Sequence, residues 1–439
     1  SFWRVFFYFY IMEKNKSLLF LALYYFSFTI PQYIQGLFVV YDRVSVQIVF
    51  ISLLNLIVFL SFRKDFDLDI FIRKFRYKKH LLAYFLVILL SSISLFVADN
   101  LTEGIITLTK LITLFIAFIL IVLVVFNSEI NFIKYFFYLC IVSIAIETFV
   151  INYVTIDSTI NDGNLLDKAT RESGLSGNIN ISSFSIAIKL PVILYLIYMI
   201  KSNYKLILIL LVLSSSILSI LLLSSRAAII AVILVLVSSL IYFSIKEKTK
   251  SVLKSFFIIL SITISSFCYN LINEKNNFNI LEDRFSSFND PVQDDSISER
   301  MGFYKIAIDD IKSSPFFGVG IGNWKITSIL RANEFLFGYR IPYFVHNDFL
   351  EVTAESGIIS GLSYLYFLTF PVLILFIRII NKKNNNLSYI PFICLAVFII
   401  DSLLNFPMNR VISMINLFFT ITLFYIVEKN KNYKSEKFF

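Results

Sequence analysis

The feature that most constrains this chain is a series of long apolar segments that recurs from one end of the sequence to the other. Each runs for about 20 residues, the length that a helix needs to cross a bilayer core of roughly 30 Å. Inside lipid every backbone N–H and C=O group must find a partner, and a helix provides those partners within the segment itself. The chain is 58% hydrophobic over its 439 residues, more than water-soluble domains use. The sequence therefore predicts an all-α, polytopic membrane protein.

Twelve spans can be placed on the sequence, with one long loop between the ninth and the tenth. The spans are residues 17–40, 44–62, 81–98, 105–126, 132–154, 181–200, 206–223, 227–245, 252–272, 357–377, 390–404 and 411–427. This placement predicts three consecutive parts. Residues 1–272 hold nine spans, residues 273–356 form the long loop, and residues 357–439 hold three spans and a tail.

Basic residues are distributed unevenly between the two predicted sides of the membrane. If the N-terminus is cytoplasmic, 24 Lys and Arg residues fall on the cytoplasmic side and five fall in the short loops opposite. Cytoplasmic loops carry such an excess, so both termini are predicted to be cytoplasmic and the long loop to lie on the outer side. The net charge of +9 then favours contact with anionic membrane lipids and no nucleic-acid partner. His80, in the basic cluster RKFRYKKH (73–80), is expected on a solvated face beside the membrane.

The sequence offers no metal site and no cofactor motif. The three cysteines, Cys140, Cys268 and Cys394, lie in apolar segments, where we expect them to pack as small core residues. No cluster of histidine and cysteine residues has the spacing of metal ligands. We therefore predict neither a metal nor a cofactor.

The long loop has the pattern of a folded element. It carries eight basic and thirteen acidic residues, and a loop of this length usually carries function. Residues 296–314 have helical spacing, with Ser298 as a possible cap and Pro315 as the end. The apolar residues that fall on one face of this helix are Met301, Tyr304, Ile308 and Ile311. The segment FFGVGIGNW (316–324) follows and predicts a glycine-rich turn.

Several charged residues lie within or beside the predicted spans. They are Lys110, Glu147, Lys189, Arg226 and Asp401. A charge in a membrane helix is costly, so each marks either an internal ion pair, a side chain that reaches the interface, or a functional site. All five fall in the outer half of the membrane, which favours chemistry at the external surface over a transport path through the midplane. Arg226 sits in a tight turn, and arginine is suited to bind phosphate oxygens.

Four segments together resemble the O-antigen ligase/polymerase superfamily of bacterial inner membranes. They are RESGLSGNINISS (171–183), LLLSSRAAII (221–230), ERMGFYKIAIDDIKSSPFFGVGIGNW (299–324) and FVHNDFLEVTAESGIISGLSYL (344–365). The resemblance implies transfer of a glycan from undecaprenyl diphosphate to an acceptor sugar hydroxyl, on the periplasmic face and without a metal. It also implies catalytic roles for Arg226, Arg300 and His346.

The residue types agree with that chemistry. Two arginines can neutralise the diphosphate leaving group as its charge develops. Histidine can take the proton of the sugar hydroxyl near neutral pH. Asn347 and Glu355 can orient the imidazole or bind sugar, or else cap the helix that begins near Gly357. The further candidate substrate-binding residues are Arg171, Lys189, Asn347, Glu355 and Arg410.

The acceptor is left open by the sequence. A polymerase would extend another lipid-linked repeat, with a chain-length regulator as a candidate partner, whereas a ligase would transfer to a lipid A core. A protein O-oligosaccharyltransferase would use a Ser or Thr side chain, and the non-enzyme alternative is a polysaccharide flippase or transporter. The abundance of Phe, Ile, Lys and Asn, typical of AT-rich polysaccharide gene clusters, favours the polymerase.

Overall fold

The computed structural model confirms the predicted fold class. It describes residues 15–29, 43–63, 77–128, 130–161, 174–246, 250–276, 295–331, 342–381 and 386–429. Throughout these ranges the regular structure is helical, and no strand occurs in them. Ten helices in the described residues are long and apolar enough to cross a membrane.

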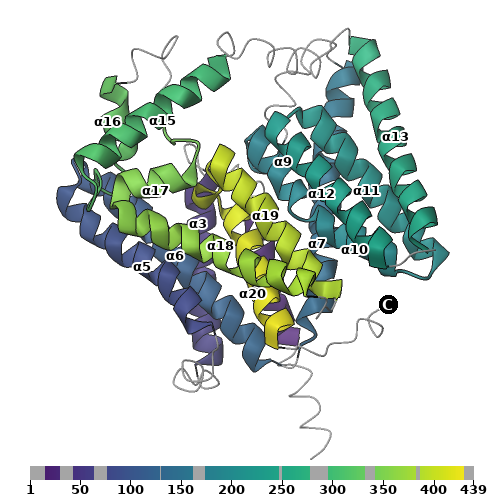
Figure 1. Cartoon of the computed structure of the whole chain (residues 1–439), viewed down its shortest axis with the longest axis horizontal. Helices are drawn as coiled ribbons and strands as arrows, with labels where there is room; N and C mark the ends of the chain where they lie inside the picture. Colours follow the sequence, from purple (N-terminus) through teal and green to yellow (C-terminus); the bar gives the residue numbers. More distant parts are fainter. Residues whose placement is uncertain are drawn as a thin grey trace, which may run out of the picture. The chain divides into compact units, whose positions relative to one another are not determined.

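The chain divides into two compact units, each assembled from separated stretches of sequence. The first takes its described residues from Ser1–Tyr135, Pro291–Phe376 and Ser402–Lys429. Its main helices are α3 (Arg43–Phe62), α5 (Lys78–Ser94), α6 (Leu101–Asn127), α15 (Asp295–Ser313), α16 (Trp324–Arg331), α17 (Asp348–Ser356), most of α18 (Ile358–Ile380) and α20 (Val411–Lys429). Within this unit α15, α16 and α17 pack against one another, and α17 also packs against α5 (Figure 1).

The second unit takes its described residues from Phe136–Asp290 and Ile377–Asp401. Its helices are most of α7 (Phe132–Asn161), α9 (Ile179–Ala187), α10 (Leu190–Met199), α11 (Asn203–Leu223), α12 (Arg226–Lys246), α13 (Lys250–Asn276) and most of α19 (Tyr389–Leu404). Helices α9 to α13 pack side by side (Figure 1). The predicted division into three consecutive parts stays a prediction.

Ten of the predicted spans correspond to helices of membrane-spanning length. The eleventh corresponds to the shorter apolar helix α19, and the first begins in a helix at residues 15–25 but continues beyond the described residues. One span is interrupted, because residues 188 and 189 form a turn between α9 and α10. Pro191 lies in the first turn of α10. Backbone N–H groups in the first turn have no intrahelical acceptor, so the N–H that proline lacks costs the helix no hydrogen bond.

His80 is buried, so the prediction of a solvated position was wrong. Pro371 lies inside α18 and has no N–H, so it cannot donate to the carbonyl of Phe367 one turn earlier. The Nε2 atom of His80 donates to that carbonyl over 2.6 Å, and its Nδ1 atom accepts from the Tyr425 hydroxyl over 2.6 Å. The histidine therefore satisfies a backbone group that the proline leaves open. The sequence could not reveal this, because the three helices involved are far apart along the chain.

Helix α15 confirms the predicted helix but corrects its buried face. Met301 and Ile308, predicted to share the apolar face, are 62% and 42% exposed. The buried residues of the helix include Phe303, Ile306 and Ala307, which join a core cluster with residues of α16 and α17. Tyr304 and Ile311 of the predicted face are partly buried and pack against the same cluster, so the buried face is shifted rather than replaced. Ser298 lies inside the helix rather than at its start, so it is not the cap.

Candidate active site

The glycine-rich turn after α15 (316–324) is hydrogen-bonded to the end of α17. The backbone N–H of Val319 donates to Ala354 O over 2.8 Å, and that of Gly320 donates to Glu355 O over 3.0 Å. Gly318 has φ 68°, and a Cβ there would lie 2.4 Å from Ala354 O. No larger residue fits so close an approach in a left-handed conformation. The predicted turn is therefore confirmed, and its glycines serve the close docking of the backbone.

His346 stands at the junction between this docked region and α17. Its φ of 62° places a non-glycine residue in the left-handed region, which costs about 1–2 kcal/mol. The Tyr304 hydroxyl donates to the carbonyl of His346 over 3.2 Å. On the other side, Asn347 caps α17 by accepting from the N–H of Leu350 over 3.1 Å. The neighbouring contacts thus hold His346 in a conformation that it would not adopt alone.

The imidazole of His346 lies between two aromatic rings. It stacks on Phe303 at 6.3 Å between centroids, and Phe406 meets it edge-on at 4.8 Å. Its Nδ1 atom is buried and has no hydrogen-bond partner. Burial lowers the pKa of His346 to about 3, and the positive charges of Arg300 and Arg410 act in the same direction. The site therefore presents a neutral imidazole with a vacant nitrogen beside two guanidinium groups.

The guanidinium group of Arg410 lies over two stacked phenylalanine rings, Phe344 and Phe406. Its guanidinium carbon lies 5.0 Å from the ring centroid of Phe406 and 5.9 Å from that of Phe344. The two phenylalanine rings stack on each other at 4.4 Å. A guanidinium that lies over an aromatic face keeps its positive charge. Arg410, a candidate from the sequence, is thus placed near His346, as is Arg300.

Buried carboxylates of α17 bind the backbone around this group. The N–H of Val345 donates to Glu351 Oε2 over 2.9 Å, and the side-chain amide of Asn409 donates to Glu351 Oε1 over 2.6 Å. The N–H of Met408 donates to Asp348 Oδ2 over 3.0 Å. Neither Glu351 nor Asp348 was among the candidates from the sequence motifs. The signal was their spacing with Glu355, since residues 348, 351 and 355 fall on one helical face.

Glu355 and Asn347 have structural partners. Glu355 Oε1 accepts from the N–H of Trp324 over 3.2 Å, which holds the start of α16. Burial and the charge of Glu351 raise the pKa of Glu355 to about 8. Asn347 caps α17 rather than the helix that begins after Gly357. The contacts of both side chains favour the capping and packing alternative over a bond to the imidazole.

Arg226 lies in the second unit, in a turn with similar backbone strain. Ser224 ends α11 with φ 52°, and Arg226 begins α12. The Ser225 hydroxyl donates to the side-chain carbonyl of Asn180 over 2.7 Å, which ties this turn to the start of α9. Asn178 caps α9 in the same region. Arg171, the candidate from the segment RESGLSGNINISS (171–183), lies outside the described residues.

The left-handed non-glycine residues of the described chain are Ser224 and His346. Each lies in one of the four segments that carry the family resemblance. Such strain persists only where the surroundings enforce it, and it concentrates at functional sites. This observation draws attention to both motifs independently of their charges.

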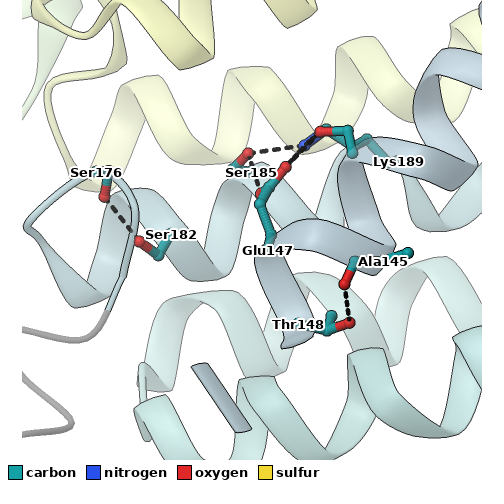
Figure 2. Close-up of polar contacts among 8 residues, drawn as sticks. Ala145, Glu147, Thr148, Ser176, Ser182, Ser185 and Lys189 are labelled. Carbon is teal, nitrogen blue, oxygen red and sulfur yellow. Dashed lines mark hydrogen bonds and ion pairs between the residues drawn. The ribbon is translucent and has the colours of Figure 1, made fainter. Parts of the chain in front are cut away.

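Lys189 lies in a buried ion pair (Figure 2). Its Nζ pairs with Glu147, and it also donates to the hydroxyls of Ser143 over 2.9 Å and Ser185 over 3.0 Å. Ser185 in turn donates to Glu147 Oε2 over 2.7 Å (Figure 2). Both charged side chains are nearly inaccessible, at 2% and 3% exposure. This geometry favours the ion-pair alternative for Glu147 and a structural role for Lys189.

The described residues contain no group of three or more His, Cys, Asp or Glu side chains arranged to hold a metal ion.

The sequence of the chain matches the model of the O-antigen ligase family over residues 208–365. This match supports the resemblance of the chain to the O-antigen ligase/polymerase superfamily. The matched region includes the turn before Arg226, helix α15, the glycine-rich turn and His346. Comparison with curated proteins found no match. At the level of the family, the match supports glycosyl transfer of the O-antigen ligase/polymerase type.

Proposed function

We propose that this protein transfers a glycan from undecaprenyl diphosphate to a sugar hydroxyl at the periplasmic surface of a bacterial inner membrane. The acceptor in this proposal is another lipid-linked repeat, which makes the protein a polymerase. The observation that carries the proposal is the vacant Nδ1 of His346 beside Arg300 and Arg410. Acceptance of a proton and stabilisation of an anionic leaving group are the two tasks of the reaction.

The reaction begins with attack of the acceptor hydroxyl oxygen on the anomeric carbon of the donor sugar. The bond between that carbon and the diphosphate oxygen breaks, and its electron pair leaves with the diphosphate. His346 takes the hydroxyl proton, and Arg300 and Arg410 stabilise the negative charge of the leaving group. Arg226, in the second unit, is also proposed as a catalytic residue, on the basis of the family resemblance and of its position at the start of α12 after the strained Ser224.

Substrate binding adjusts the basicity of His346 in this scheme. In the free protein the pKa of His346 is lowered to about 3, partly by two neighbouring arginines. Burial is the larger cause of this lowering, but a bound diphosphate offsets the arginine charges and so raises the pKa of His346 above its value in the free protein. The imidazole is therefore neutral before the donor binds and becomes a stronger base once the donor is in place.

The experiment uses purified protein with a lipid-linked glycan as donor and two acceptors in parallel. A polymerase lengthens the glycan on the carrier, whereas a ligase transfers it to a lipid A core. Activity that is unchanged by EDTA is expected, because the arginines supply the positive charge. A chelator-sensitive reaction that Mg²⁺ restores would contradict the leaving-group assignment. Movement of the donor across a membrane without a new glycosidic bond would favour the flippase instead.

A further inference from the structure

Two short segments bring the reactive side chains of the first unit to one place. Residues 342–347 carry His346, and residues 405–410 carry Arg410. Neither segment is a helix of more than one turn, so neither has the internal hydrogen-bond ladder that fixes a long helix. Their relative position must come from contacts between them or to a third element. Helix α17 provides that third element.

We propose that Glu351 is the positioning residue of this site, because its two carboxylate oxygens join the His346 segment to the Arg410 segment. One oxygen accepts from the N–H of Val345, directly before His346, over 2.9 Å. The other accepts from Asn409, directly before Arg410, over 2.6 Å. This inference rests on the proposed function, since it assigns the means by which the base and the arginine are aligned.

The orientation of Asn409 supports this assignment. Lys110 Nζ donates to the side-chain carbonyl of Asn409 over 2.6 Å. An ammonium group has only donors, so this contact fixes which end of the amide faces Lys110 and which faces Glu351. Asn409 therefore presents its NH₂ group to Glu351. Lys110, one of the charges noted in the membrane segments, serves here to orient the amide.

A carboxylate is required between these two partners. Both Val345 and Asn409 offer a donor, so the group between them must accept at both ends. Glutamine has the same shape but accepts at only one end, and its NH₂ group would face a donor at the other. Glu351→Gln therefore breaks one of the two contacts while preserving the volume of the side chain. Asn409→Leu breaks the Arg410 side alone.

The charged groups around Glu351 predict how the contact responds to pH. Burial raises the pKa of Glu351 to about 7, while Lys110 from α6 and Lys325 from α16 oppose that rise. On α17 itself, two further buried carboxyl groups share the face of Glu351: Asp348 lies one turn earlier, and Glu355, whose pKa the charge of Glu351 raises, lies one turn later. A raised carboxyl pKa means that the charged form is present above about pH 7 and is lost as the pH falls. Turnover should therefore decline on the acidic side as Glu351 takes up a proton.

The test compares Glu351→Gln with Glu428→Gln in the purified full chain. Glu428 is a matched control, since it is a buried glutamate of the same unit, bonded to Tyr77 at the far end of α20. Two quantities are measured: the steady-state kcat and KM for the lipid-linked donor from about pH 5 to pH 9, and hydrogen–deuterium exchange of peptides covering residues 342–347 and 405–411. His346→Ala is assayed in parallel.

For Glu351→Gln we expect kcat to fall about 100-fold, the scale of a 1 Å misplacement, with a smaller change in KM. The acidic decline should move to lower pH, and both peptides should exchange faster. Asn409→Leu, the second variant if the first does not fold, should speed exchange in 405–411 only. Glu428→Gln should behave as the wild type in both measurements.

Wild-type kcat in Glu351→Gln, or unchanged exchange in both peptides, would overturn the positioning role. Loss of transfer in His346→Ala would then show that the proposed function stands without it. Conversely, wild-type transfer in His346→Ala would remove the proposed base. Faster exchange in Glu351→Gln would in that case still identify the contact between the two segments, so the two failures are distinguishable.

Discussion

The Glu147–Lys189 pair in the second unit and the His346 site in the first show two ways to bury titratable groups. The ammonium of Lys189 has three acceptors, Glu147, Ser143 and Ser185, for its three donors. His346 lies among aromatic rings with Nδ1 vacant, and its charged neighbours, Arg300 and Arg410, have the wrong sign to pair with it. Burial is common to both regions, so burial alone does not indicate function.

The difference lies in hydrogen-bond satisfaction. A buried polar group without a partner costs about 1–3 kcal/mol, so folding alone gives no reason to retain it. The charged groups of the pair in the second unit have hydrogen-bond and ion-pair partners within the protein. The Nδ1 atom of His346 has no hydrogen-bond partner in the folded chain, and in the proposed reaction the acceptor sugar hydroxyl is its donor. We therefore propose a structural role for the pair in the second unit and a chemical role for His346.

The largest effect is expected from breaking the pair in the second unit. Lys189→Met leaves Glu147 buried without its cation, and loss of one partner of a buried pair costs about 3–5 kcal/mol. The double variant Lys189→Met/Glu147→Leu should recover most of that free energy, because no charge remains. Thermal unfolding in detergent measures both. If the double variant were stable but had lost donor binding, Lys189 would be a substrate ligand after all.

Variants of Arg300 and Arg226 test whether these arginines serve donor binding and transfer rather than stability. Arg300→Ala and Arg226→Ala should weaken donor binding, transfer, or both, while their unfolding temperatures stay near that of the wild type. Lysine at either position should restore only part of the loss, because the charge returns without the planar pair of donors. Separate measurement of donor Kd and turnover checks this. Full recovery by lysine would show that charge alone is required.

The titration of His346 sharpens the comparison further. The pKa is lowered to about 3, so the imidazole should remain neutral from about pH 8 down to about pH 5. The chain has only two histidines, so NMR of labelled histidine gives a simple spectrum, and His346→Ala assigns it. Addition of undecaprenyl diphosphate should raise the pKa of His346 as the arginine charges are offset. A signal that already titrates near pH 6.5 in the free protein would contradict the buried, vacant imidazole.

The sequence predicted the helices far better than their contacts. Span length and hydropathy are local properties, so ten spans were located correctly. The buried face of α15 was not, because Met301 and Phe303 lie on different faces and both are apolar. His80 was misplaced because its acceptor, Phe367 O, is left open by a proline in a distant helix.

The candidate site was predictable only in part, because motifs are local in the sequence whereas contacts between distant segments are not. His346 and Arg300 were found through motifs, which are continuous stretches of sequence. The role of Glu351 depends on Val345, Asn409 and Lys110 meeting in space, and no spacing along the chain encodes that meeting. Local patterns therefore identified the candidate reactive groups, whereas the residues proposed to position them could be found only in the folded structure.

The smallest effect on activity is expected from a test of membrane orientation. Ser298 on α15 and Ser202 before α11 are both exposed, and the charge distribution places them on opposite sides of the membrane. Cysteine at Ser298 should react with an impermeant maleimide in intact spheroplasts, whereas cysteine at Ser202 should react only after lysis. Cys268→Ser removes the less buried native thiol. The reverse labelling pattern would place the His346 site on the cytoplasmic side.

The most direct test of the account is the single-turnover rate of transfer by His346→Ala with the lipid-linked donor already bound. Loss of a general base slows the chemical step by about 10²–10⁴-fold, and the donor Kd should stay close to that of the wild type. The double variant Lys189→Met/Glu147→Leu, assayed beside it, should transfer at the wild-type rate per folded molecule. Wild-type transfer by His346→Ala would contradict the assignment of chemistry to the unsatisfied imidazole.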